Sequence, residues 1–305
     1  MQDGMKVKEC IAEFLYECQI RQFTKKTVKG YRNALNVLQQ FLDSKGVEQI
    51  EDVNVIVLKS FFAEMIKTNH KETYINGLLK VCRALWKYLC EQEYITVNPT
   101  LKVRWAKEPK TIIKTFTDDE VKRMLKVYSK GKDYLSIRNQ TVMEMLFDTG
   151  VRCFELCELS NKAIEDSYIR IYGKGKKERQ VGLSPYMIKQ MMKYERTFKE
   201  FFCYRIPKYD NYFLSRTGRP LTVVAVENIV KRCGIQANVR DEIRCSPHTC
   251  RHWFAQAQLK NGIDVYSLSR LMGHENIKIT QRYLQGLQDA DVVSKSIKTS
   301  PLMNL

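Results

Sequence analysis

The chain has 305 residues, 44% of them hydrophobic, which is enough for one large or two ordinary domains with a buried core. Its net charge of +17 makes it a strongly basic protein and indicates a polyanionic partner, most often nucleic acid. No apolar run approaches the ~20 residues that span a bilayer, and the N-terminus, "MQDGMKVKECIAEF", mixes charges into its apolar positions, unlike a signal peptide. We therefore expect a cytoplasmic protein with no membrane partner.

The first hundred residues show apolar positions at helical spacing in four segments. These are "VKECIAEFLYECQI", "FTKKTVKGYRNALNVLQQFLDSKG", "VIVLKSFFAEMIK" and "ETYINGLLKVCRALWKYLCEQEYI". They predict an all-α, four-helix domain over residues 1–105, followed by a basic linker over 106–114. Basic residues on these helices either contact DNA or form an ordinary solvated face: Lys25, Lys26, Lys29, Arg32, Lys80 and Arg83.

Residues 115–305 predict a second domain with more helices and one small β-element. Thr117 and Glu120 form a capping-box pattern at a helix start, and a later helix ends at Gly150. Residues 167–183 instead alternate apolar and polar positions on both sides of "GKGKK", which is typical of a β-hairpin with a basic tip. The fold class is thus mainly α with a small β-sheet (α+β). Most of the excess charge lies here, since residues 1–105 carry +4 and the remainder +13.

Three of the four histidines lie near the C-terminus. After the helix start at Ser246-Pro247, His248, Arg251 and His252 are spaced to share one face near the positive helix end, where a phosphate binds well. His274 follows a helix stop at Gly273, and Tyr283 comes nine residues later. Although His248 and His252 match the spacing of a zinc-binding helix, the glutamate of that motif is missing. We therefore expect no metal and no other cofactor.

Together these motifs resemble the signature of the tyrosine recombinases, the phage integrase family. The matching segments are "DTGVRCFEL", "YGKGKKERQVGL", "HTCRH", "LMGH" and the tyrosine that follows, in family order. The resemblance covers about residues 115–290 in detail and extends more loosely to the N-terminal helices, which look like a SAM-like core-binding domain. It implies a two-domain clamp on DNA.

The resemblance also implies roles for the polar residues. Tyr283 would attack a DNA phosphodiester and form a 3′-phosphotyrosine, while Arg152 and Arg251 would bind the two non-bridging phosphate oxygens. Lys174, the first of three lysines at the hairpin tip, would protonate the leaving 5′-oxygen. Its neighbours Lys176, Lys177 and Arg179 would touch the DNA backbone.

The remaining site residues have weaker assignments. His248 would help to deprotonate Tyr283 or bind the phosphate, and His274 would hydrogen-bond the phosphate. Glu155 resembles the family's acidic residue that orients the first arginine, here Arg152. His252 is given only a supporting role, packing or bonding near Arg251.

The function implied is site-specific recombination of double-stranded DNA through a Holliday junction. The protein would be a homo-tetramer on two synapsed sites and a monomer or weak oligomer when free, with accessory DNA-bending proteins as further partners. A C-terminal helix at about 286–305 would dock on a neighbouring protomer or fray. The expected role, in a bacterium or phage, is integration and excision of a mobile element. The alternatives are resolution of chromosome or plasmid dimers and a type IB topoisomerase-like relaxing activity.

Overall fold

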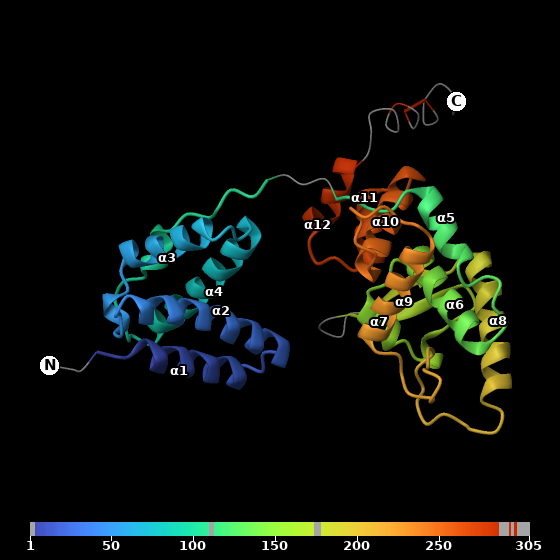
Figure 1. Ribbon diagram of the computed structural model, residues 1–305, viewed down its shortest axis with the longest axis horizontal. Helices are drawn as coiled ribbons and strands as arrows, with labels where there is room; N and C mark the ends of the chain where they lie inside the picture. The colour runs from blue at the N-terminus through green and yellow to red at the C-terminus, as the bar shows by residue number, and fades with distance from the viewer. Residues whose placement is uncertain (1–3, 110–112, 174–177, 287–292, 294–295, 298–305) are drawn as a thin grey trace. The chain divides into compact units, whose positions relative to one another are not determined.

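The computed structural model describes residues 4–109, 113–173, 178–286, 293 and 296–297 (Figure 1). The chain divides into two compact units, Met1–Lys110 and Thr111–Leu305. Each unit has its own hydrophobic core. The predicted fold class is confirmed: the chain is mostly helical, and a single two-stranded sheet is found in the part that the structure describes.

The described residues of the first unit form four α-helices, as the apolar spacing predicts, and two 3₁₀ turns. The helices are α1 (Val7–Ile20), α2 (Lys25–Ser44), α3 (Val55–Lys67) and α4 (Glu72–Glu91), with η1 (Ile50–Asp52) and η2 (Pro99–Lys102) between and after them. Thr24 caps α2 by accepting a hydrogen bond from the Thr27 backbone N–H at 3.2 Å. Trp86, at 1% exposure, is the largest side chain in this core. Each helix therefore buries the stripe that its sequence marks.

The segment after α4 is attached to the first unit. Val103 is part of its core, and Ala106 exchanges two backbone hydrogen bonds with the Asn76 side chain, at 2.8 and 3.0 Å. The Arg83 guanidinium donates to the Val103 carbonyl at 2.8 Å and lies 4.3 Å from the centre of the Trp105 ring. Arg83, for which the sequence left DNA contact or a solvated face open, thus helps to hold this segment against α4.

In the second unit, other helices and the two strands surround one central helix, α6 (Tyr134–Thr149). In chain order these are α5 (Asp118–Lys126), α6 (Tyr134–Thr149), α7 (Cys153–Cys157), η3 (Asn161–Ala163), β1 (Tyr168–Tyr172), β2 (Glu178–Gly182), α8 (Pro185–Phe201), α9 (Val223–Gln236), α10 (Pro247–Lys260), α11 (Val265–Met272), α12 (Ile277–Gln281) and η5 (Arg282–Gly286). The antiparallel strands pair Ile169 with Val181 and Ile171 with Arg179. The β-hairpin prediction is confirmed.

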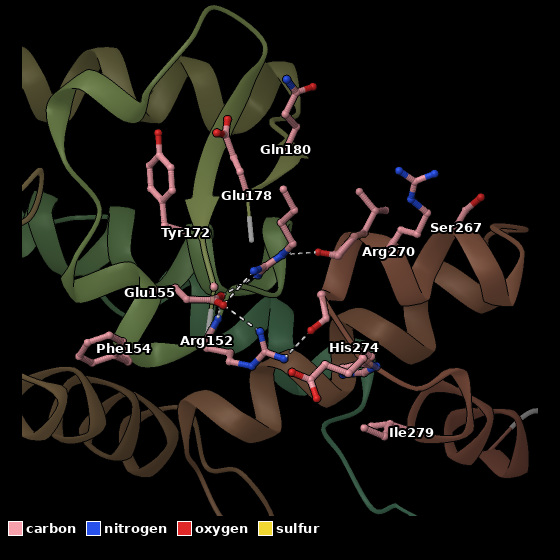
Figure 2. Close-up of a pocket in the computed structure, with 15 residues that line it drawn as sticks. Arg152, Phe154, Glu155, Tyr172, Glu178, Gln180, Ser267, Arg270, His274 and Ile279 are labelled. Atoms are coloured by element: carbon pink, nitrogen blue, oxygen red, sulfur yellow. Dashed lines mark hydrogen bonds and ion pairs between the residues drawn. The ribbon is translucent and has the colours of Figure 1, made fainter. Parts of the chain in front are cut away.

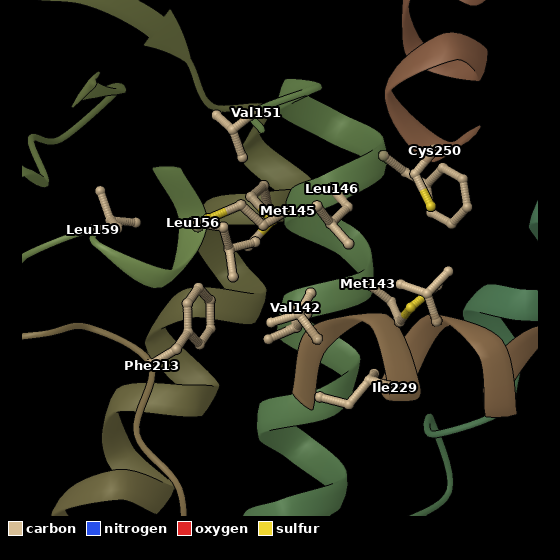
Figure 3. Packing of buried hydrophobic residues seen from close by; sticks show 14 of the residues in the cluster. Val142, Met143, Met145, Leu146, Val151, Leu156, Leu159, Phe213, Ile229 and Cys250 are labelled. Carbon is tan, nitrogen blue, oxygen red and sulfur yellow. The ribbon is translucent and has the colours of Figure 1, made fainter. Parts of the chain in front are cut away.

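Helix α6 is buried on almost all sides. Its first turn and its last two turns contribute apolar residues to the core, and Figure 3 shows Val142, Met143, Met145 and Leu146 among side chains from neighbouring elements. α8, α9 and α10 pack directly on it. Even its polar side chains Arg138, Gln140, Thr141 and Glu144 are buried, so the helix lies in the centre of the domain. Its C-terminal end is therefore a fixed point, and it carries the first of the predicted site motifs.

No helix in the described ranges is long and apolar enough to cross a membrane. The predicted C-terminal helix at about 286–305 falls mostly outside the residues that the structure describes.

Candidate active site

The first site element is the sharp turn between α6 and α7. Gly150 ends α6 with a left-handed backbone (φ 60°), and a Cβ there would meet the Phe254 ring of α10 at 2.3 Å. Only glycine meets both requirements without strain. Arg152 then caps α7 and forms a capping box with Glu155, whose Oε2 accepts from the Arg152 backbone N–H at 2.8 Å. This turn fixes Arg152 at the end of a buried helix.

Glu155 lies between two arginines. Its Oε1 accepts from Arg152 Nη1 and Arg179 Nη1, both at 2.8 Å, and its Oε2 accepts from Arg179 Nη2 at 2.6 Å (Figure 2). Burial raises the pKa of this carboxyl, but the hydrogen bonds and charges of Arg179 and Arg152 outweigh burial and bring the pKa to about 2. Glu155 is therefore ionised at neutral pH and orients Arg152.

Arg179, predicted to touch the DNA backbone, makes contacts within the second unit. Besides both oxygens of Glu155, it donates from Nε to the Leu271 carbonyl at 2.8 Å, and its side chain is only 11% exposed. The reason is the strand register, because Arg179 pairs with the buried Ile171 and so points to the inner face of the hairpin. Arg179 ties β2 to α11 instead of reaching outward.

Helix α10 supplies the second arginine. Ser246 caps the helix. Arg251 is 3% exposed and lies between the C-terminal ends of α6 and α11. Its Nη1 donates to the Gly150 carbonyl at 2.6 Å, and its Nη2 donates to the Met272 carbonyl. Burial, followed by the charge of Arg152, lowers the pKa of Arg251 to about 10, which leaves it charged at neutral pH. Arg251 joins the ends of α6 and α11.

His274 is placed by the left-handed turn at Gly273 after α11. Its Nε2 lies 3.3 Å from Arg251 Nη2, and its Nδ1 lies 2.8 Å from Thr280 Oγ1. Burial, then Arg251 and Arg152, lowers the pKa of His274 to about 4, so the ring is neutral near pH 7. Because arginine only donates, Nε2 accepts and Nδ1 carries the proton toward Thr280.

Tyr283 lies in η5 and is 3% exposed. It belongs to a small core with Phe254, Leu259, Leu268 and Met272. Its ring stacks on that of His274 with centroids 6.4 Å apart, and its hydroxyl lies 2.9 Å from His252 Nδ1. The His248 and His252 rings are 4.1 Å apart, as expected for i and i+4 on one helix. His252 is thus in contact with the tyrosine, which its predicted supporting role near Arg251 did not include.

A pocket of about 1410 Å³ opens beside this cluster, between the hairpin and α11. Figure 2 shows Arg152, His274, Tyr172 and Gln180 around it. The complete lining is Arg152, Phe154, Glu155, Tyr172, Gly173, Glu178, Arg179, Gln180, Ser267, Arg270, Leu271, Gly273, His274, Glu275 and Ile279. The Arg152 side chain is 42% exposed, and it also donates to the Gly273 carbonyl at 2.9 Å. The pocket therefore offers an anion the accessible guanidinium of Arg152, which Glu155 already orients.

The residues at the hairpin tip are outside this description. Lys174, Lys176 and Lys177 lie in 174–177, which the structure does not describe, so their predicted roles remain predictions. Within the described ranges, no group of three or more His, Cys, Asp or Glu side chains is arranged to hold a metal ion.

Comparison with family models places both units. Residues 114–289 match the phage integrase family, and residues 11–93 match the phage integrase N-terminal SAM-like domain. The chain belongs to the phage integrase family. Its members, the tyrosine recombinases, are enzymes that cut and rejoin DNA at specific sites, so the predicted enzyme class is confirmed.

Individual relatives agree with the family assignment. The tyrosine recombinase XerD of Staphylococcus aureus is 27% identical over 276 residues, which cover 90% of this chain and 92% of the relative. The XerH recombinase bound to a palindromic difH substrate shares the fold at a TM-score of 0.75 and 18% identity, over 94% of this chain and 84% of that one. The lambda integrase tetramer bound to a Holliday junction gives a TM-score of 0.72 and 16% identity, over 92% and 78%.

The structure brings most of the predicted site residues of this family member together. Arg152, Glu155 and Arg179 form one group of contacts, and Arg251, His274, Thr280 and Tyr283 form a second. The arginines of both groups donate to consecutive backbone carbonyls at the end of α11, those of Leu271, Met272 and Gly273. Sequence reasoning missed the hydrogen bond between His252 and Tyr283, because no spacing rule relates α10 to η5. It named Arg179 as a DNA contact but did not predict its bonds to Glu155 and Leu271, although the two-residue period from Val181 places Arg179 on the core face of the hairpin.

Proposed function

We propose that Tyr283 is the nucleophile of this recombinase and that Arg152 and Arg251 bind the scissile phosphate. The proposal rests on the observation that the predicted site residues lie close together in the structure. Residues from four separate segments meet in one cluster, in which Arg251 bonds to His274 at 3.3 Å and the ring of His274 stacks on that of Tyr283. Arg152 joins the same cluster through the Gly273 carbonyl. Such a grouping of cations around a phenol fits transfer of a phosphoryl group to the phenol.

The two arginines have different places in this scheme. Arg152 lines the pocket with an exposed side chain that Glu155 already orients, so it binds the phosphate with little further loss of freedom. Arg251 is buried behind it and adds positive charge in a medium that screens weakly. An arriving phosphate also favours protonation of the neutral His274, whose Nε2 could then donate to a phosphate oxygen.

The reaction is an exchange of one phosphodiester for another. The Tyr283 oxygen attacks phosphorus, its proton leaves to an acceptor, and the bond to the 5′-oxygen breaks. Lys174 protonates that oxygen, which gives a 3′-phosphotyrosine and a free 5′-hydroxyl. Attack by a 5′-hydroxyl from a partner strand reverses these steps and restores the tyrosine. The phosphotyrosine bond conserves the energy for rejoining, so no nucleotide cofactor is required.

The setting of the reaction is proposed from the relatives and the charge. Double-stranded DNA with specific sites would be the substrate, bound with a steep dependence on salt because of the excess of cations. A homo-tetramer on a Holliday junction, as in the lambda integrase structure, would be the working assembly. We propose a cytoplasmic, DNA-associated location in a bacterium or phage. Integration and excision of a mobile element is the proposed role, with resolution of chromosome or plasmid dimers as the alternative.

A covalent trap tests the proposal. The protein is incubated with nicked duplexes from its native locus and a partly randomised pool, with a chelator present, and the products are separated under denaturing conditions. We expect a chelator-resistant adduct on the peptide containing Tyr283, and no adduct from Tyr283→Phe, which loses one hydroxyl and no charge. Equal DNA binding by both proteins is the control. An adduct formed by Tyr283→Phe would show that the nucleophile is another residue.

The captured DNA distinguishes the two biological roles. Sequences at the two ends of one movable segment would support integration and excision. A single conserved site per replicon, recombined between directly repeated copies on a dimeric plasmid, would support dimer resolution.

A further inference from the structure

His252 makes the hydrogen bond to the Tyr283 hydroxyl. Its Nδ1 lies 2.9 Å from the hydroxyl oxygen, and the two ring centroids are 5.4 Å apart. The tyrosine is 3% exposed, so water has little access to compete for this bond. The family resemblance assigns His252 only to support and gives His248 two alternative roles, deprotonation of Tyr283 or phosphate binding. In the structure, it is His252 that contacts the Tyr283 hydroxyl, and the His248 ring packs on His252, the partner of Tyr283 in that bond.

The surroundings of His252 keep its ring neutral. The groups that face it are His248 and Arg251 from α10, Arg282 and Tyr283 from η5, and His274 from the turn after α11. Burial, followed by the charges of His248 and Arg251, lowers the pKa of His252 to about 4. Near neutral pH the imidazole therefore has one free lone pair. With the ring proton on Nε2, that lone pair is on Nδ1, facing the hydroxyl that donates to it.

We propose that His252 is a catalytic residue that accepts the hydroxyl proton of Tyr283 as the tyrosine oxygen bonds to phosphorus. The inference rests on the proposed function, in which Tyr283 is the nucleophile. As the O–H bond breaks, the proton passes to Nδ1 and the imidazole becomes an imidazolium. The O–P bond forms, the bond to the 5′-oxygen breaks, and Lys174 supplies the proton of the leaving group. In rejoining, the imidazolium returns its proton to the tyrosine oxygen.

The position of His252 on α10 allows it to act at the reacting phosphate. It directly follows Arg251, the buried phosphate ligand, and its ring packs against that of His248 at 4.1 Å. The imidazolium would form beside a bound phosphate, whose negative charge stabilises it and opposes the cations that now keep the ring neutral. DNA binding thus makes His252 a stronger base at the moment when the proton must be transferred.

The first measurement is the rate of covalent adduct formation under single-turnover conditions with saturating DNA. We expect His252→Ala and His252→Asn each to lower this rate by about 100-fold, the lower end of the range for a positioned general base. Asparagine keeps a hydrogen-bond acceptor near the position of Nδ1 but does not take up a proton. His70→Ala, which removes the histidine beside Tyr74 in the first unit, is the matched control and should cleave at the wild-type rate. DNA affinity and thermal unfolding of all variants establish that they are folded.

A second substrate distinguishes the residue that accepts the tyrosine proton from the residue that protonates the leaving group. When sulfur replaces the bridging 5′-oxygen, the leaving thiolate needs no proton. We expect Lys174→Ala to recover on this substrate and His252→Ala to remain about 100-fold slower than wild type, because the tyrosine must still lose its proton. Recovery of His252→Ala would place the histidine on the donor side and overturn the proposal.

Two other results would also overturn it. Adduct formation by His252→Ala at or above the wild-type rate would mean that the hydrogen bond between His252 and Tyr283 only holds the tyrosine in place before DNA binds. His252→Asn at the wild-type rate would mean that positioning alone is needed. Failure of the proposed function is distinguishable from all of these, because the wild-type protein would then form no adduct at Tyr283 on either substrate.

Discussion

The lysines predicted to contact DNA in the first unit and the site arginines of the second unit are held in different ways. In the first unit, Lys25, Lys26 and Lys29 on α2 and Lys80 on α4 have exposed side chains. In the second unit, the guanidinium groups of Arg152, Arg179 and Arg251 each bond to a carboxylate or a carbonyl before any ligand arrives. An exposed lysine must lose rotamer freedom when it binds a phosphate, whereas a held arginine has already lost it.

Because of this difference, we expect the exposed lysines to determine the affinity for DNA and the held arginines to determine the rate of the chemical step. Exposed lysines attract DNA through a long-range field that salt screens, and each contributes a small, nearly interchangeable part. The held arginines have fixed directions and stabilise charge where the reaction develops it. Mutations in the first group should therefore change binding and its salt dependence, and mutations in the second should change the chemical step.

The largest expected effect is that of Arg152→Ala. It removes a pocket-lining guanidinium that Glu155 already orients and whose side chain is 42% exposed. We expect the rate of adduct formation at saturating DNA to fall by about 10²–10³-fold, the cost of losing one fixed donor to a developing oxyanion. Lys80→Ala is the matched control and should keep the wild-type rate. A wild-type rate for Arg152→Ala at saturation would contradict the division between the two groups.

The Glu155→Gln variant tests whether the charge of Glu155 holds Arg152 and Arg179 in place. We expect it to lower the free energy of unfolding. The folded-state pKa of about 2 lies below the ordinary value of 4.5, so the ionised carboxylate stabilises the fold above about pH 4.5. This contribution is lost as the pH falls from 4.5 toward 2. At pH 7 we expect the variant to be less stable by about 3 kcal/mol, since the side chain is only 5% exposed and its arginines lose their counter-charge.

Urea unfolding of both proteins at pH 7 and pH 3 checks this prediction. The difference in the free energy of unfolding between wild type and Glu155→Gln should narrow at the lower pH. A difference that stays constant would mean that the charge of Glu155 is not what stabilises the pair of arginines.

Features set by neighbouring residues could be predicted from the sequence. Thr117, Ser246, Asp264 and Asn276 all cap helices as their positions indicate, because a cap needs only the next two or three backbone N–H groups. The stops at Gly150 and Gly273 follow from the same local chemistry. These caps and stops fix the ends of the helices that carry the site, which is why the motif residues converge as the resemblance implies.

Features set by the approach of distant segments could not be predicted. The bond between His252 and Tyr283 depends on how η5 packs against α10, 31 residues away in the chain. The burial of Tyr283 depends on the same packing. Arg179 is an intermediate case, because the strand period predicts its inward face, but its partners Glu155 and Leu271 come from elsewhere.

The smallest expected effects compare two cations on one helix, Lys80 and Arg83 of α4. Lys80 is exposed, whereas Arg83 bonds to the Val103 carbonyl and stacks on Trp105. If Lys80 contacts a phosphate, Lys80→Ala should reduce the slope of log K against log salt by about 0.9 and leave thermal unfolding unchanged. Arg83→Ala should lower the unfolding temperature of the first unit, because it frees the segment after α4, and should leave the slope unchanged. If Arg83→Ala instead reduces the slope and Lys80→Ala does not, Arg83 leaves Trp105 to bind DNA. A cation that is bonded within the free first unit would then still contribute to the DNA interface.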